Sequence, residues 1–279
     1  MSKTDIQAVV FDFGGVLLDW NPRYLYRPFF PENPQAMEDF FLEVGFHEWN
    51  LSLDKGRPFA EAVPELSAQF PHHSELIRAF DERWHHCIGG RIEGTIDILR
   101  TLKEAGTHSL YGLSNWSAET FYRIRPDYEF FDWFDFIVLS GEVKLIKPDP
   151  AIFQYLLDQT GQPAEACVFI DDMAYNVEAA QQLGIRGIQF TSPEQLAADL
   201  RVAVHLQVLE MILHQLAFQL EIVALGQFGI ALDGVQLKQQ AFLEVAGADA
   251  GGFQSLDQAQ GGFEVLRGKR GLPLFLDHL

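Results

Sequence analysis

The sequence predicts an α/β fold in which a doubly wound parallel sheet carries an inserted helical cap. Short apolar segments that end at polar residues alternate with segments whose apolar residues recur at helical spacing. Such alternation is typical of a parallel sheet with helices on both faces. The alternation is interrupted once, after the first apolar segment, and this interruption predicts the cap.

Three of the predicted strands end at a side chain that can take part in chemistry. Asp12 follows AVVF, Ser114 follows SLYGL, and Asp171 follows CVFI. Ligands of doubly wound sheets bind at the carboxyl ends of the strands, so we expect these side chains to meet at one edge. The predicted strands are residues 8–11, 109–113, 136–139, 167–170 and 187–190.

The interrupting segment, residues 21–88, is rich in aromatic residues and carries helical patterns such as MEDFFLEV. It predicts an all-helical cap inserted into a core that comprises residues 1–20 and 89–204. Gly89 and Gly90 predict a hinge where the cap ends. Phe46, His47 and Trp49, in GFHEWN, are predicted to line the underside of the cap, where His47 and Trp49 would touch the substrate. Packing within the cap explains these residues at least as well.

The last part of the chain, residues 205–279, differs in character from the rest. Its first half is apolar at loosely helical spacing, and a glycine-rich stretch follows. It contains no recognisable metal-ligand cluster or nucleophile pattern. The sequence therefore predicts a C-terminal extension of unknown role.

Composition excludes several classes of partner. A formal net charge of -19 repels polyanions, so nucleic acid is not an expected partner. No run of about 18 apolar residues and no signal-peptide pattern occur, which predicts a cytoplasmic protein without a membrane partner. Cys87 and Cys167 lie far apart and predict no disulfide. The sequence leaves the oligomeric state open.

Four motifs in a fixed order carry a resemblance to a known family. FDFGGV, LSN, KPDP and FIDDMAYN resemble the four motifs of the haloacid dehalogenase superfamily, whose hydrolases use an aspartate nucleophile. The superfamily includes enzymes with a helical cap after the first strand of a Rossmann-like sheet. The resemblance extends from residue 7 to about residue 200. The pattern DxGxV with a later DDxxxN is similar to the branch that contains bacterial α-D-glucose-1-phosphate phosphatase.

The resemblance implies three catalytic residues, Asp12, Ser114 and Lys147. Asp12 would attack phosphorus and form an aspartyl-phosphate. Ser114 and the backbone of Asn115 would hold the phosphoryl oxygens, and Lys147 would neutralise charge on the transferring group. The expected substrate is a small phosphomonoester of the sugar-phosphate kind.

The motifs also predict a magnesium site. Asp171 and Asp172 are adjacent carboxylates at a strand end, an arrangement that is costly without a cation. Mg²⁺ takes hard oxygen ligands, and the predicted ligands are Asp12, the Gly14 carbonyl, Asp171 and Asp172. Asn176 is expected to hydrogen-bond the Asp171–Asp172 loop or to support the ligands.

One departure from the family pattern concerns the leaving group. Many phosphatases of the superfamily carry a general acid two residues after the nucleophile, and here that position is Gly14. Another group must then protonate the leaving group, and Asp19 is a candidate by proximity. The missing acid also keeps open a catalytically weak protein with a binding or regulatory role.

The remaining alternative is a 2-haloacid dehalogenase, because LSN followed by Trp116 also resembles those enzymes. They hold the departing halide with an arginine early in the cap, well beyond the nucleophile. Residues 28–56 contain no arginine, and Arg23 and Arg27 lie close to the start of the cap. The carboxylate pair would also be unfavourable in a metal-free site. The sequence therefore favours the phosphatase.

Overall fold

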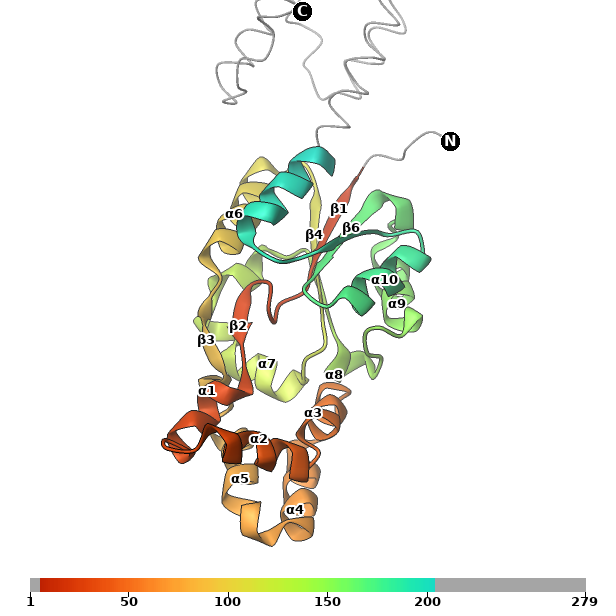
Figure 1. The fold of residues 1–279 in the computed structure, drawn as a ribbon. Coiled ribbons are helices and arrows are strands. Elements are labelled where there is room, and N and C mark those ends of the chain that lie inside the picture. Colours follow the sequence, from red (N-terminus) through yellow and green to blue (C-terminus); the bar gives the residue numbers. More distant parts are fainter. Residues whose placement is uncertain (1–5, 204–279) are drawn as a thin grey trace, which may run out of the picture. The chain divides into compact units, whose positions relative to one another are not determined.

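A five-stranded parallel sheet forms the centre of the protein in the computed structural model, which describes residues 6–203 (Figure 1). The strand order is β5-β4-β1-β6-β7, with all neighbours parallel. Each strand lies within one residue of its predicted position, which confirms the α/β fold class. The bounds are β1 Ala8–Phe11, β4 Ser109–Ser114, β5 Phe136–Leu139, β6 Cys167–Asp171 and β7 Arg186–Gln189.

Helices cover both faces of the sheet because successive side chains of each strand point to opposite sides. Val9 and Phe11 of β1 belong to a core shared with α6 and α7, whereas Ala8 and Val10 belong to a core shared with α9 and α10. The helices are α6 Glu93–Ala105, α7 Ala118–Ile124, α9 Pro150–Thr160 and α10 Ala174–Gln182, and residues 193–203 are also helical.

Local sequence signals set the ends of the helix that follows KPDP. The Asp149 side chain caps α9 by accepting a hydrogen bond from the Ala151 N–H, and Pro150 occupies the first helical turn. Gly161 ends the helix in a left-handed conformation with φ 67°. This start fixes the position of the loop that carries Lys147.

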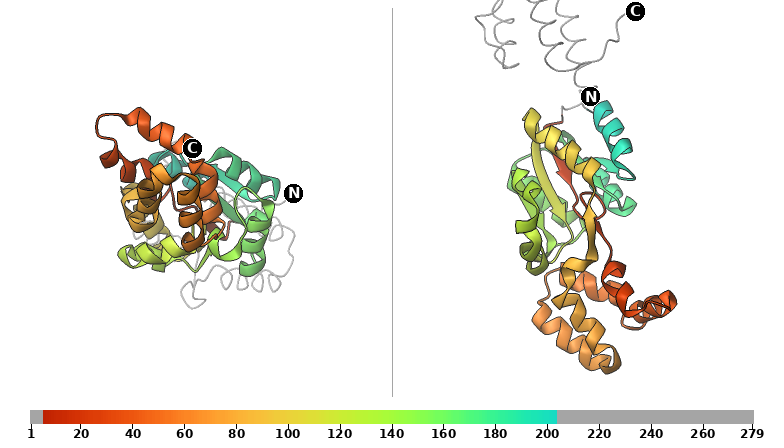
Figure 2. Two further views of the ribbon diagram at one scale, coloured as in Figure 1. Left: turned by 90° about the horizontal axis from the view of Figure 1, so that it is seen from below. Right: turned by 90° about the vertical axis from the view of Figure 1, so that its left-hand side faces the viewer.

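Five helices form the inserted cap, and Figures 1 and 2 place them beside the end of the sheet where β1 finishes. Aromatic side chains fill its interior, for example Tyr26, Phe40, Phe46 and Phe80. The cap helices are α1 Pro22–Tyr26, α2 Pro34–Glu43, α3 Phe46–Asp54, α4 Phe59–Gln69 and α5 Ser74–Glu82.

The two connections between cap and core pair with each other as a short antiparallel ribbon. β2 (Leu18–Trp20) and β3 (Ile88–Arg91) form this ribbon, and the predicted hinge residues Gly89 and Gly90 lie in β3. The sequence did not predict these strands, because three and four residues are too few to show an alternating pattern.

Short helical segments complete the described chain. They are α8 Ser140–Val143, η1 Arg27–Phe29, η2 Pro71–His73, η3 Trp84–Cys87, η4 Arg125–Asp127, η5 Glu129–Trp133 and η6 Ala164–Ala166. Within residues 6–203, no helix has the length and apolar character needed to cross a bilayer. Cys87 and Cys167 are buried free thiols. The predicted extension, residues 205–279, lies outside the described residues.

Candidate active site

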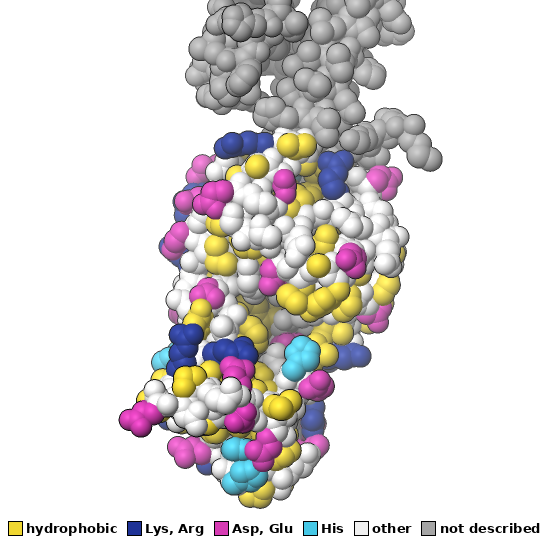
Figure 3. Space-filling view, viewed as in Figure 1, with side chains coloured by type: hydrophobic (Ala, Val, Ile, Leu, Met, Phe, Trp, Pro, Cys, Tyr) yellow, Lys and Arg dark blue, Asp and Glu magenta, His cyan; other side chains and the backbone are white. Residues whose placement is uncertain are grey.

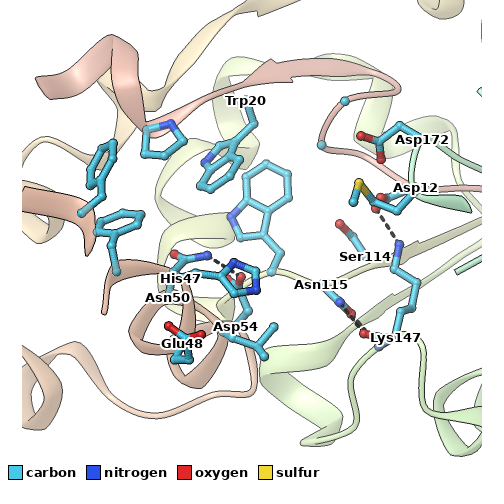
Figure 4. A pocket seen from close by; sticks show the side chains of 18 of the residues that line it. Asp12, Trp20, His47, Glu48, Asn50, Asp54, Ser114, Asn115, Lys147 and Asp172 are labelled. Atoms are coloured by element: carbon cyan, nitrogen blue, oxygen red, sulfur yellow. Dashed lines mark hydrogen bonds and ion pairs between the residues drawn. The ribbon is translucent and has the colours of Figure 1, made fainter. Parts of the chain in front are cut away.

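A cavity of about 690 Å³ lies between the cap and the carboxyl ends of the strands. The core contributes Asp12, Ser114, Asn115, Lys147 and Asp172 to its wall, as the sheet topology predicts. Figure 4 shows these side chains on one side of the cavity and cap residues such as His47 on the other. Figure 3 shows hydrophobic side chains around the hollow between the two parts.

Lys147 is the centre of the buried polar network. Its Nζ donates to Asp12 Oδ1 at 2.9 Å, to Asp171 Oδ2 at 2.7 Å and to the Leu113 carbonyl at 2.9 Å. These three acceptors match the three protons of an ammonium group. Lys147 is 3% exposed, so the two ion pairs are shielded from water.

Burial and the ion pairs act in opposite directions on the charges of this network. Burial raises the pKa of Asp12 to about 7, and the nearby Lys147 ammonium works against that rise. Burial alone would lower the pKa of Lys147, but the Asp12 and Asp171 carboxylates outweigh it and raise that pKa. Lys147 therefore stays charged and favours the ionised form of Asp12.

The Asn115 side chain positions Lys147. Asn115 Nδ2 donates to the Lys147 carbonyl at 2.9 Å, and Asn115 Oδ1 accepts from the Lys147 N–H at 2.8 Å. The amide thereby ties the loop after β4 to the loop before α9. The sequence linked Asn115 to substrate oxygens through its backbone and gave no sign of this side-chain contact, which spans 32 residues.

The predicted metal ligands Asp12, Asp171 and Asp172 come together in the structure. Oxygen atoms of the three carboxylates lie within 4.8 Å of one another. This hard, anionic donor set fits a Mg²⁺ ion. The Asp171 carboxylate has several hydrogen-bond donors. Besides Lys147 Nζ, it accepts from the Met173 N–H at 2.8 Å and from Asn176 Nδ2 at 3.0 Å. The predicted contact between Asn176 and this loop is therefore confirmed.

The two glycines after Asp12 have different structural roles. Gly15 has φ +74°, and a Cβ there would lie 2.6 Å from Asp172 Oδ2, so only glycine brings the first loop this close to the carboxylate. A Cβ at Gly14 would meet Trp20 Cβ at 3.8 Å, an ordinary contact. Gly14 lines the cavity, consistent with the predicted use of its carbonyl, but the space alone does not require glycine.

The cap residues predicted from GFHEWN separate into two groups. Phe46 and His47 line the cavity, whereas Trp49 is buried in the cap against Phe46 and Phe80. Placing Trp49 on the underside of the cap with His47 was therefore wrong. Residues two positions apart on a helix point in nearly opposite directions, so both side chains cannot face the cavity.

The helical period from His47 identifies the residues that do face the cavity. His47, Asn50, Leu51 and Asp54 lie at positions i, i+3, i+4 and i+7 of α3, and all four line the wall. Asp54 is not among the site residues predicted from the sequence, although its helical spacing from His47 indicates it. Asp19, the predicted proton donor, is instead on the exposed ribbon, where it accepts from the Tyr24 hydroxyl at 2.7 Å.

Comparison with known proteins agrees with the fold and the motifs. The sequence matches the haloacid dehalogenase-like hydrolases over residues 6–184, and the chain belongs to this family. It is 27% identical over 202 residues to the sesquiterpene phosphatase astK of Aspergillus oryzae, covering 72% of this chain and 98% of that protein. It is 28% identical over 192 residues to the phosphorylated carbohydrates phosphatase of Thermotoga maritima, covering 66% of this chain and 84% of that protein.

A solved structure that contains bound magnesium and phosphate shares this fold. The wild-type haloacid dehalogenase family enzyme from Bacteroides thetaiotaomicron, in complex with magnesium and inorganic phosphate, is 25% identical with a TM-score of 0.53. The similarity covers 67% of this chain and 95% of that chain. The comparisons do not single out the glucose-1-phosphate phosphatase branch that the motif spacing resembles.

Proposed function

We propose that this hydrolase cleaves phosphomonoesters through an aspartyl-phosphate on Asp12. The observation that supports this most strongly is the buried Lys147, which bridges Asp12 and Asp171 and so favours an ionised nucleophile. Among the described residues, Asp12 Oδ1 also accepts from the Phe13 N–H at 2.7 Å, so Oδ2 is the oxygen that we assign to attack. Forming the P–O bond to Oδ2 releases the alcohol, and water then hydrolyses the acyl-phosphate.

The other core residues hold the phosphoryl group during transfer. In this proposal the Ser114 hydroxyl and the Asn115 N–H donate to phosphoryl oxygens, and Lys147 offsets their charge. Asp12, Gly14, Asp171 and Asp172 are the proposed ligands of Mg²⁺, whose charge would offset that of the phosphoryl group. The magnesium and phosphate complex of the Bacteroides enzyme supports this assignment.

Replacing Asp172 with asparagine should raise the Mg²⁺ concentration needed for half-maximal phosphate release by about tenfold or more, because an anionic ligand is lost. Asp172 is preferable to Asp171 for this test, since Asp171 also holds Lys147. The exposed carboxylate of Asp39, replaced in the same way, is the control. Mg²⁺ titrations that superimpose for Asp172→Asn, Asp39→Asn and the parent would remove Asp172 from the metal site.

The cavity favours an apolar organic group on the substrate. Its wall includes Trp20, Phe41, Leu51, Trp84 and Trp116. Burying hydrocarbon against such side chains contributes about 25 cal/mol per Å². The similarity to a sesquiterpene phosphatase supports the same substrate class. Sugar phosphates, the expectation from the sequence, remain the alternative, which the carbohydrate phosphatase of Thermotoga supports.

We expect kcat/KM for a sesquiterpenyl monophosphate to exceed that for glucose 1-phosphate by at least about tenfold. Phosphate release from both compounds, measured with Mg²⁺ and with EDTA, checks this. Leu51→Gln should reduce the ratio, because Leu51 faces the cavity. Val202→Gln, which changes an exposed aliphatic residue of the last described helix, should not. An equal or reversed ratio in the parent would favour sugar phosphates.

The dehalogenase alternative is disfavoured by the state of Arg23. Of the described residues that line the cavity, one is an arginine, Arg23. Its Nε and Nη2 donate to the two carboxylate oxygens of Glu38 at 2.6 and 2.7 Å. A guanidinium neutralised in this way is a poor halide site. Halide release from 2-chloropropionate in EDTA would establish a dehalogenase. A protein that releases neither phosphate nor halide would instead be a binding protein.

A further inference from the structure

The direction of attack determines where the leaving group must lie. In phosphoryl transfer the attacking and leaving oxygens are roughly in line with phosphorus. Asp12 lies on the core side of the cavity, so the ester oxygen of the substrate faces the cap. An alkoxide is a poor leaving group, and a donor that protonates it must therefore come from the cap side.

Asp54 is the cap carboxyl whose geometry fits this task. It is the last residue of α3 and lines the cavity opposite Asp12 and Ser114 (Figure 4). Its Oδ1 accepts from the Ser117 N–H at 3.2 Å, and its Oδ2 accepts from Asn50 Nδ2 at 2.8 Å. The Asp54 carbonyl accepts from Ser140 Oγ at 2.5 Å. These contacts fix the carboxyl against the core. The contacted residue Ser117 lies three residues after Ser114 in the chain.

Other acidic groups near the cavity are less suited to donate a proton. Glu38 is paired with Arg23, which lowers the pKa of Glu38, and Asp19 is bound to Tyr24 on the exposed ribbon. Burial raises the pKa of Asp54 to about 8, although the bonds from Ser117 and Asn50 oppose this rise. A carboxyl with that pKa carries its proton near neutral pH and can release it during the reaction.

We propose that Asp54 is the general acid that protonates the leaving group, a role that rests on the proposed phosphatase function. As Asp12 Oδ2 bonds to phosphorus, the P–O bond to the substrate alcohol breaks and the alcohol oxygen takes the proton of Asp54. Asp54 is then a carboxylate. In the second step it accepts a proton from the water that attacks phosphorus, which breaks the P–O bond to Asp12 and restores both carboxyl groups. Position 14 can therefore be glycine.

The test compares substrates that do and do not need a proton donor. Asp54→Asn should lower kcat/KM for an alkyl phosphate by about 10²-fold or more, but only a few-fold for 4-nitrophenyl phosphate, whose leaving group departs as a stable anion. Asparagine can keep the acceptor for the Ser117 N–H, and rotation of the Asn50 amide restores the second bond. A merely structural role would lower both rates equally, and that result would overturn the proposal.

Two control variants separate proton donation from the contact between cap and core. Ser140→Ala removes the bond to the Asp54 backbone and leaves the carboxyl intact, so its effect should be the same for both substrates. Asp19→Asn should leave the ratio of the two rates unchanged. Suppose that Asp19→Asn or His47→Gln selectively lost alkyl phosphate hydrolysis while Asp54→Asn kept it. The residue changed in that variant, and not Asp54, would then be the proton donor to the leaving group.

The pH profile gives a second readout. With the alkyl phosphate, kcat/KM of the parent should fall as the pH rises through about 8, and this fall should be absent in Asp54→Asn. The charged and titratable groups on the elements around Asp54 include His47, Glu48 and Lys55 on or after α3, and Asp12 of the core. Glu119 of α7, Glu142 of α8 and Lys144 after it complete this set.

A measurement on the parent protein covers the case in which Asp54→Asn does not fold. Across a series of alkyl and aryl phosphates, kcat/KM should depend only weakly on the acidity of the leaving alcohol, because the donor assists the poor leaving groups. A steep dependence would show that no donor acts and would overturn the proposal while leaving the phosphatase in place. A parent that releases phosphate from none of the series would instead contradict the proposed function.

Discussion

Replacing Asp12 with asparagine is expected to lower kcat for phosphate release by at least about 10³-fold. The amide has nearly the same shape, and its oxygen can accept the bonds that Asp12 Oδ1 receives from the Phe13 N–H and Lys147 Nζ. It lacks the negative charge that attacks phosphorus. The fold should therefore survive while the acyl-phosphate does not form. Phosphate release in Mg²⁺, with circular dichroism as a check on folding, measures this.

Thermal stability provides an independent check on the same variant. Burial raises the pKa of folded Asp12 from 3.8 to about 7, so folding favours the protonated carboxyl. The parent should lose stability as the pH rises from about 4 to about 7, whereas the asparagine variant lacks this loss. In EDTA, the melting temperature of Asp12→Asn should equal or exceed that of the parent at pH 8, with a smaller difference at pH 5.

The exposed carboxylate of Asp158 serves as the matched control. It lies on the surface of α9 and accepts from Gln154, so Asp158→Asn should change neither kcat nor the pH dependence of melting. A folded Asp12→Asn protein with phosphate release near that of the parent would show that Asp12 is not the nucleophile.

The core of the site could be predicted because a simple rule places its residues. Parallel strands end at one edge, so polar residues after apolar segments must converge there. Asp12, Ser114 and Asp171 are in this position: Asp12 and Asp171 both pair with Lys147, and Ser114 lines the same cavity as Asp12. The strands themselves were predictable because each is a short, strongly apolar run.

The cap side of the site was harder to predict, for two physical reasons. An α-helix has 3.6 residues per turn, so neighbouring residues of GFHEWN face different directions. Trp49 therefore packs against Phe80, whereas His47 faces the cavity. The contact of Asp54 with the Ser117 N–H depends on how the cap sits on the core. No local pattern encodes that placement, although the spacing of His47 and Asp54 put both on one face of α3.

The last large effect is expected for Lys147→Met, which removes the ammonium from the buried network. Asp12 and Asp171 would then be left without their cationic partner, and the Leu113 carbonyl would lose its donor. Breaking a buried ion pair in this way costs about 3–5 kcal/mol of folding free energy. Phosphate release should be lost, because the transferring group and the nucleophile both lose the positive charge.

The loss of stability in Lys147→Met should depend on pH in a definite direction. The ammonium works against the rise in the pKa of Asp12, so without it this buried carboxylate gains more by taking up a proton. The variant should therefore be most destabilised at pH 8 and less so at pH 5. Lys103→Met is the control, because Lys103 makes a surface pair with Asp135 at 3.5 Å, and such pairs contribute little. If Lys147→Met had the same melting temperature as Lys103→Met at both pH values, the buried network would not stabilise the fold.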